Sequence, residues 1–236
     1  MKIKYILTLA VGLMAVLQTT NAADLTGVVS LKGTPPPERE VTPIRNDPNC
    51  SALYPGALPT THFYVAGKKG ELADVVVMLK GGNFKSTGAS AAPAVLDQKG
   101  ALYVPQIIAI QTGQLLIVKN SDPFIHNVHT VPKENPEANL AQMAGGEDLK
   151  FTFNKPESFL KFQCDVHPWM FAWVTVVDHP YFAVTDKDGK YTIKDVPPGK
   201  YTVTALHRKL APAGVEQPVE VKADGAQADF TLEVKK

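Results

Sequence analysis

Short apolar runs separated by turn residues constrain the fold of this chain more than any other feature of its sequence. The runs are rich in Val, Ile, Thr, Tyr and Phe, and each is only a few residues long, which is typical of strands rather than helices. Pro- and Gly-rich turns at 35–37, 81–83 and 197–199 lie between them. The pattern predicts an all-β protein of sandwich type. The predicted strands are 25–31, 73–79, 106–110, 115–119, 127–131, 151–153, 159–162, 172–177, 191–193, 201–206, 218–221 and 230–234.

One segment favours a helix instead. Residues 137–144 have a helical composition, and Gly145 and Gly146 follow them, where a glycine can adopt the left-handed conformation that ends a helix. A loop is the alternative for this segment.

Charge and composition exclude several classes of protein. The 236 residues are 44% hydrophobic and 20% charged, which excludes a disordered tail and a multipass membrane protein. The chain has 24 Lys and Arg against 23 Asp and Glu, so no broad positive field is available for a nucleic-acid backbone. We therefore expect one or two globular domains that bind no nucleic acid.

The N-terminal residues 1–23 have the three zones of a secretory signal peptide. Lys2 and Lys4 provide a basic start, residues 5–17 form an apolar run, and a small polar stretch ends near Ala22 and Ala23, where we expect cleavage. The apolar run is shorter than the roughly 20 residues needed to cross a membrane. The sequence thus predicts a mature protein without a membrane span, exported to the bacterial periplasm, where thiols tend to oxidise.

Four potential metal ligands occur at a characteristic spacing. Cys164, His167 and Met170 follow one another at intervals of three residues, and His126 lies upstream on a predicted strand. A thiolate, an imidazole and a thioether at this spacing can all turn inward from one tight loop, and the second imidazole can complete the set. Two His and one Cys with a weakly bound Met are the donors of an electron-transfer copper centre.

Other interpretations of this motif fit less well. A structural zinc site needs four good donors and a catalytic one needs an open position, and a thioether suits neither. Covalent haem attachment needs Cys-x-x-Cys-His, and the first Cys is missing. A cysteine nucleophile would need a nearby base and an oxyanion hole, for which no motif is visible. Simple packing of a buried Cys and Met remains the structural alternative.

The segment around these residues resembles the cupredoxins, of the amicyanin and plastocyanin type. The resemblance rests on Cys164-Asp-Val-His167-Pro-Trp-Met170 and on the His-Asn-Val-His sequence that begins at His126, and we assign residues 84–178 to this domain. It implies a Greek-key sandwich that holds one copper ion and shuttles one electron between Cu(II) and Cu(I), and so a carrier rather than an enzyme. The ligands implied are His126, Cys164, His167 and Met170, with Asn127 tying its strand to the loop near Asp165.

Strand geometry favours His126 over His129 as the ligand from the upstream motif. Residues three apart on an extended strand point to opposite faces, so both imidazoles cannot reach one ion without a bulge. We expect His129 to lie at the surface.

The C-terminal residues resemble a second family. Residues 185–191 predict a tight hairpin and residues 196–203 a turn into a strand, in the pattern of the carboxypeptidase regulatory-like domain, a small β-sandwich. We assign it residues 179–236. The strands expected earlier in this family have counterparts in residues 24–83, so we expect a discontinuous sandwich interrupted by the copper domain.

A copper carrier needs redox protein partners. We expect electrons to pass at His167, with an apolar docking patch formed by Pro168, Trp169 and Phe171. The alternatives are a copper-binding storage, delivery or interaction protein, and a copper enzyme with an additional three-histidine site. Cys50 could form a disulfide only with Cys164, which would consume the proposed ligand; a free or intermolecular Cys50 remains the other option.

Overall fold

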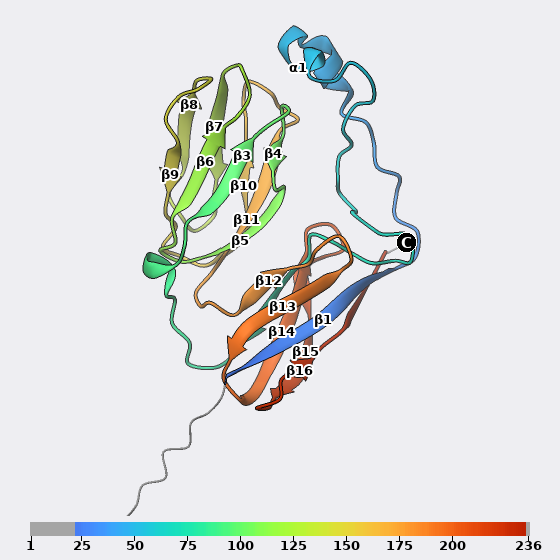
Figure 1. Ribbon diagram of the computed structural model, residues 1–236, viewed down its shortest axis with the longest axis vertical. Coiled ribbons are helices and arrows are strands. Elements are labelled where there is room, and N and C mark those ends of the chain that lie inside the picture. Colours follow the sequence, from blue (N-terminus) through green and yellow to red (C-terminus); the bar gives the residue numbers. More distant parts are fainter. Residues whose placement is uncertain (1–21, 235–236) are drawn as a thin grey trace, which may run out of the picture.

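Two β-sandwiches hold all of the strands in the described residues, and the chain passes between them twice (Figure 1). The computed structural model describes residues 22–234. The signal peptide predicted for residues 1–23 therefore lies outside the described residues, apart from its last two positions. Among the described helices, none is both long and apolar enough to cross a membrane.

The first sandwich contains both metal-ligand motifs. One sheet has the order β5-β11-β10-β7-β8 and the other β4-β3-β6-β9. Aliphatic and aromatic side chains from both sheets, Phe162 and Leu116 among them, fill the space between. The strands are β3 (Ala94–Gln98), β4 (Tyr103–Val104), β5 (Ile107–Gln111), β6 (Leu116–Asn120), β7 (His126–Val131), β8 (Ala138–Gln142), β9 (Leu149–Phe151), β10 (Glu157–Gln163) and β11 (Phe171–Val177).

The second sandwich combines strands from both ends of the chain. Strand β1 pairs antiparallel with β13 and parallel with β16 and β17. In the facing sheet, β2 lies between β12 and β14, and β15 follows β14. Segments before and after the first sandwich thus share one core. The strands are β1 (Ala23–Lys32), β2 (Val76–Lys80), β12 (Phe182–Val184), β13 (Lys190–Val196), β14 (Gly199–His207), β15 (Ala211–Val221), β16 (Ala226–Gln227) and β17 (Phe230–Glu233).

Between β1 and β2 the chain leaves the second sandwich in a long excursion, residues 33–75, which we call the strap. It contains the 3-10 helix η1 (Thr42–Asn46) and the short helix α1 (Pro48–Ala52), and a further 3-10 turn, η2 (Gly88–Ser90), follows β2. Figure 1 shows the strap rising in blue from the second sandwich to α1. Ile44, Cys50 and Leu58 of the strap belong to the buried cluster of the first sandwich.

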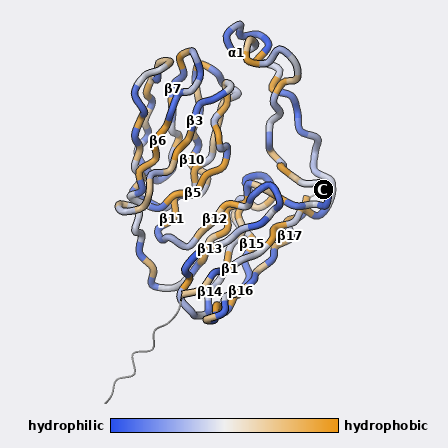
Figure 2. Tube along the Cα trace, in the orientation of Figure 1, coloured by the Kyte–Doolittle hydropathy of each residue, from blue (hydrophilic) through white to orange (hydrophobic). Residues whose placement is uncertain are grey.

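The predicted all-β class is confirmed, with hydrophobic residues concentrated along the strands of both sandwiches (Figure 2). The helix predicted for residues 137–144 is wrong, and so is the alternative of a loop. Residues 138–142 form β8, which pairs antiparallel with β7 from His126 opposite Gln142 to Thr130 opposite Ala138. Hydrogen bonding to a neighbouring strand overrides the weak local preference for a helix.

Candidate metal centre

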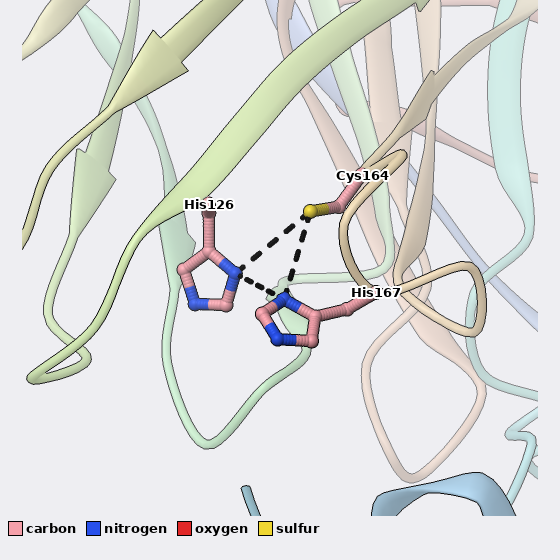
Figure 3. A group of neighbouring side chains, drawn as sticks. All are labelled: His126, Cys164 and His167. Carbon is pink, nitrogen blue, oxygen red and sulfur yellow. Dashed lines mark hydrogen bonds between the residues drawn. The ribbon is translucent and has the colours of Figure 1, made fainter. Parts of the chain in front are cut away.

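The ligand atoms of His126, Cys164 and His167 converge at one end of the first sandwich (Figure 3). His126 is the first residue of β7, Cys164 follows the last residue of β10, and His167 lies in the loop that joins β10 to β11. The Cys164 Sγ atom lies 3.9 Å from Nδ1 of His126 and 3.7 Å from Nδ1 of His167. The two Nδ1 atoms are 2.9 Å apart.

This triangle has the size that a bound ion requires. Sulfur and nitrogen ligands at about 2.0–2.3 Å from one ion lie roughly 3 to 4 Å from each other. His126, Cys164 and His167 are 0%, 1% and 3% exposed, so water competes little for the position between them. The structure therefore brings together three predicted ligands in a buried site of metal-binding size.

Met170, the fourth predicted ligand, closes the loop that carries the other two. Its backbone N–H donates to the carbonyl of His167 at 2.9 Å, and its carbonyl accepts from the N–H of Cys164 at 3.2 Å. The side chain is completely buried in the core of the first sandwich. These two bonds hold Cys164, His167 and Met170 in one tight turn.

Asn127 fastens this turn to β7. Its Oδ1 accepts the backbone N–H groups of Asp165 at 2.6 Å and Val166 at 3.2 Å, while its Nδ2 donates to the Asp165 carboxylate. The backbone N–H of Asn127 points at the Cys164 sulfur, 3.5 Å away. One side chain thus links the strand of His126 to the loop of Cys164, at the place predicted for it.

Asp122 holds the outer edge of His126. Its Oδ2 lies 2.9 Å from Nε2 of His126, and its two oxygens also accept the N–H groups of Gly100 and Ala101. Burial lowers the pKa of His126, but Asp122 and Cys164 outweigh that effect and the pKa is raised. With Nε2 bonded to a carboxylate, Nδ1 is free to face the ion position.

The electrostatics of the site favour a thiolate. Burial opposes ionisation of Cys164, but hydrogen bonding with His126 and with the backbone N–H groups of Asn127 and His167 is stronger in sum, so the pKa of Cys164 is lowered. The thiolate is the form that binds metals. Burial and the neighbouring charge of His126 lower the pKa of His167, which favours the neutral ligand form of that imidazole.

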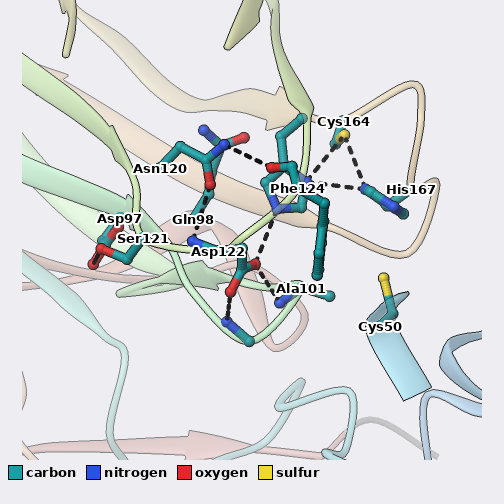
Figure 4. A network of polar contacts seen from close by, with 12 residues as sticks. Cys50, Asp97, Gln98, Ala101, Asn120, Ser121, Asp122, Phe124, Cys164 and His167 are labelled. Atoms are coloured by element: carbon teal, nitrogen blue, oxygen red, sulfur yellow. Dashed lines mark hydrogen bonds and ion pairs between the residues drawn. The ribbon is translucent and has the colours of Figure 1, made fainter. Parts of the chain in front are cut away.

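The far edge of His167 faces the strap rather than solvent. Nε2 of His167 lies 3.8 Å from Oδ2 of Asp47, the residue that caps the N-terminus of α1. Cys50 of the same helix is completely buried beside them (Figure 4). Both cysteines are free thiols, so no Cys50–Cys164 disulfide removes the ligand. Burial raises the pKa of Cys50 to about 12, and the charge of Asp47 acts in the same direction.

The predicted docking residues are only partly available to a partner. Pro168 is exposed. Trp169 is half-buried and donates its ring N–H to the carbonyl of Ala101 at 3.0 Å, and Phe171 stacks on Phe63 of the strap with ring centroids 5.9 Å apart. Trp169 and Phe171 line a groove of about 270 Å³ together with strap residues such as Val41.

His129 lies on the outer side of β7. Its Nδ1 contacts the carboxylate of Asp165 at 2.9 Å and its Nε2 that of Glu137 at 2.9 Å. Hydrogen bonding to His129 and to neighbouring amides lowers the pKa of Asp165 to about 2. His129 therefore anchors the outside of the loop and is not part of the buried group.

The sequence interpretation missed the two carboxylates of the site. Asp122 lies four residues before His126 in a turn, and a carboxylate so placed can be identified as a partner for the imidazole once the ligand is known. Asp47 precedes Pro48, the usual order of a helix cap and first turn, which predicts a helix start but not its position in space. His62, His179 and His207 lie outside both metal-binding groups found in the described residues.

One protein-family model matches part of the chain. The model of the carboxypeptidase regulatory-like domain matches residues 167–233, which confirms the resemblance predicted for the C-terminal segment. The first residues of that match belong to the metal loop and to β11 of the first sandwich. No curated protein matches the chain.

Solved structures similar to part of the chain include a nitrite reductase, a cupredoxin and amicyanin. A copper-containing nitrite reductase from Thermus scotoductus SA-01 is 22% identical over 37% of this chain and 23% of its own, with a TM-score of 0.34. A purple cupredoxin from Nitrosopumilus maritimus is 21% identical over 35% of this chain and 98% of its own, with a TM-score of 0.30. A reduced amicyanin variant is 22% identical over 42% and 97%, with a TM-score of 0.32.

Proposed function

We propose that this chain is an exported type 1 copper protein that carries single electrons between redox partners. The observation that supports this most is the buried triangle of one cysteine and two histidines, with all three donor atoms within 3.9 Å of one another. A thiolate and two imidazoles are soft and intermediate donors, which suit copper in both of its common oxidation states.

His126, Cys164 and His167 would hold the ion, with the Met170 thioether as a weak fourth donor. Bound copper supplies one-electron chemistry by alternating between Cu(II) and Cu(I). The protein's part is to keep the donors in place while the charge of the ion changes. Asp122 fixes one imidazole, and Asn127 fixes the loop that carries the thiolate.

Burial of the ligands favours a carrier over a delivery protein. A protein that releases copper must expose its ligands to a competing acceptor, whereas here the strap covers the outer edge of His167. The ring of Phe124 packs against the rings of both His126 and His167, and Trp169 packs against His167, which leaves little room for a substrate. We accordingly assign the chain no enzymatic activity.

Export and partners complete the proposal. The basic, apolar and small-polar zones of residues 1–23 support transport to the periplasm. Redox partners commonly meet over small interfaces, below about 1,200 Å². Exposed apolar residues of the metal loop and its neighbouring turn, Pro168, Val166 and Ile125, provide such a surface beside His167.

Redox cycling tests the carrier role. The copper-loaded protein would be reduced with a mild reductant, reoxidised, and passed through a desalting column after each step, with metal content measured each time. A carrier is reduced by one electron per copper and retains the metal through repeated cycles. Loss of copper to a chelating acceptor on reduction would instead identify a storage or delivery protein.

A further inference from the structure

The strap places two more metal-binding side chains against the outer edge of His167. One ligand atom from each of Asp47, Cys50 and His167 lies within 4.8 Å of the other two. The nitrogen that faces Asp47 is Nε2, 3.8 Å from Oδ2, whereas Nδ1 belongs to the triangle with Cys164. Figure 4 shows Cys50 and Cys164 on different sides of the His167 ring. The two groups share one imidazole through its two nitrogens.

The new group is held in place by the local structure of the strap. Oδ1 of Asp47 accepts the N–H groups of Asn49 and Cys50 at 2.9 Å each, as the cap of α1, so Oδ2 is left to face His167. The strap itself is anchored by the Tyr54 hydroxyl, which donates to the carbonyl of Gly100 at 2.7 Å. The cap thus holds Asp47 and Cys50 together within the strap, while His167 is held in its place by the metal loop of the first sandwich.

Simple core packing does not account for this group. A structural cysteine is normally surrounded by apolar atoms. Cys50 is completely buried, yet it lies beside a carboxylate oxygen and beside the edge of an imidazole that is itself only 3% exposed. The 3.8 Å between Nε2 and Oδ2 is too long for a direct hydrogen bond.

We propose that Asp47, Cys50 and Nε2 of His167 form a second metal site, which takes a thiophilic divalent cation of the zinc type. A thiolate, a carboxylate and an imidazole are the three donor types that Zn²⁺ uses, and three protein ligands leave a fourth position for water. Binding displaces the Cys50 thiol proton, and the Nε2 proton where present, to solvent. The site goes beyond the electron-carrier proposal, because it needs neither Cys164 nor copper.

Cobalt binding tests the site in a background where the copper triangle is broken. The chain has two cysteines, so a Cys164→Ser protein retains Cys50 as its only thiol. Titration of this protein with Co²⁺ is expected to produce thiolate-to-cobalt charge-transfer absorption that saturates at one ion per chain. Zn²⁺ should abolish the band by displacement. The further change Cys50→Ser should remove the band altogether.

Two more variants separate a ligand role from a structural one. Asp47→Asn keeps a good helix cap but loses the charged ligand, and should weaken cobalt binding about tenfold or more. Ser51→Ala changes the neighbouring, half-buried position of α1 and should leave binding unchanged. These two also carry the test if Cys50→Ser does not fold.

The opposing result is equally clear. If the Cys164→Ser protein shows no thiolate-to-cobalt band, or if the band has the same affinity in Asp47→Asn, the second site does not exist. Failure of the carrier proposal would be seen in a different experiment. The copper-loaded unaltered protein would then give the same spectrum as copper-loaded Cys164→Ser.

Discussion

Each imidazole of the proposed copper site has a carboxylate at its far nitrogen. Asp122 makes a direct contact with His126, and Asp47 lies at a longer distance from His167. A carboxylate in this position fixes the ring orientation and the tautomer and raises the basicity of the metal-binding nitrogen. The two histidines therefore differ. Asp122 is within hydrogen-bonding distance of the His126 ring, whereas the strap places Asp47 beside the His167 ring without a direct hydrogen bond.

Asp122→Asn tests the tightly held partner. The buried carboxylate satisfies two backbone N–H groups and His126, and an amide can replace only part of these contacts. We expect the metal-free protein to lose about 3 kcal/mol of unfolding free energy, as when one partner of a buried pair is removed. The pKa of His126 should fall, because Asp122 helps to raise it.

Denaturant unfolding and NMR titration of His126 measure these two effects. Asp148→Asn, at an exposed position, serves as the matched control and should change the unfolding free energy by less than about 0.5 kcal/mol. Equal stability of the two variants would show that Asp122 does not support the site.

At the scale of elements, the sequence predicted what depends on local spacing. The metal loop is a short connection between β10 and β11. The spacing of three residues between Cys164, His167 and Met170 was therefore enough to predict that these side chains lie close together. The position of α1 depends instead on a long excursion with no periodic pattern, and nothing near Asp47 or Cys50 in the sequence indicates that they lie beside His167. Strand β8 was not predicted, because its extended conformation depends on pairing with β7 and not on its own sequence.

Ile44→Ala tests the packing of the strap. Ile44 is completely buried in the core of the first sandwich, so its truncation leaves a cavity and should cost about 3 kcal/mol of unfolding free energy. The loosened strap should also increase the rate at which diethyl pyrocarbonate modifies His167. Leu53→Ala, at a side chain that is 37% exposed, is the control and should have little effect on either quantity. Equal effects of the two substitutions would contradict the role assigned to the strap.

At the scale of the whole molecule, the two sandwiches meet near the C-terminal end of β14. Val76 and Leu206 of the second sandwich pack with Ile107 of the first. His207, next along β14, is buried and its Nδ1 accepts the N–H groups of Lys209 and Leu210. A neutral ring is needed for this bonding, and burial lowers the pKa of His207 to about 4.

This shift predicts a pH dependence of stability. An unfolded histidine titrates near pH 6.5, so as the pH falls the unfolded state takes up the proton first. The unfolding free energy that depends on neutral His207 is fully present above about pH 6.5. It is lost as the pH falls from about 6.5 to 4, and the total loss approaches roughly 3 kcal/mol. The pKa values of His126 and His129 are raised, so their contribution to the unfolding free energy decreases as the pH rises above about 6.5. The effect of His207 is therefore isolated by comparing variants with the unaltered protein.

His207→Asn keeps an acceptor near the position of Nδ1 and does not titrate. Its unfolding free energy should therefore decline less than that of the unaltered protein between pH 7 and 4. His62→Asn, at an exposed histidine, should follow the unaltered protein. Parallel pH profiles for all three proteins would refute the assignment.

Partner docking also belongs to the whole molecule. Val166 is 50% exposed in the metal loop, whereas Val215 is 42% exposed on the second sandwich. Val166→Glu should slow electron exchange with a redox protein partner about tenfold, equivalent to about 1.4 kcal/mol, without changing the copper spectrum. Val215→Glu should not slow it. Stopped-flow kinetics would measure both rates, and equal rates would exclude docking at the metal loop.

The proposed electron-carrier role requires that the sulfur of Cys164 bonds directly to copper. The unaltered protein, Cys164→Ser and Cys50→Ser would each be loaded with one equivalent of Cu(II), and their visible absorption and paramagnetic resonance spectra recorded. We predict intense visible absorption with a thiolate-type resonance signal in the unaltered protein and in Cys50→Ser, and its loss in Cys164→Ser. Weak absorption that is the same in all three proteins would contradict the account.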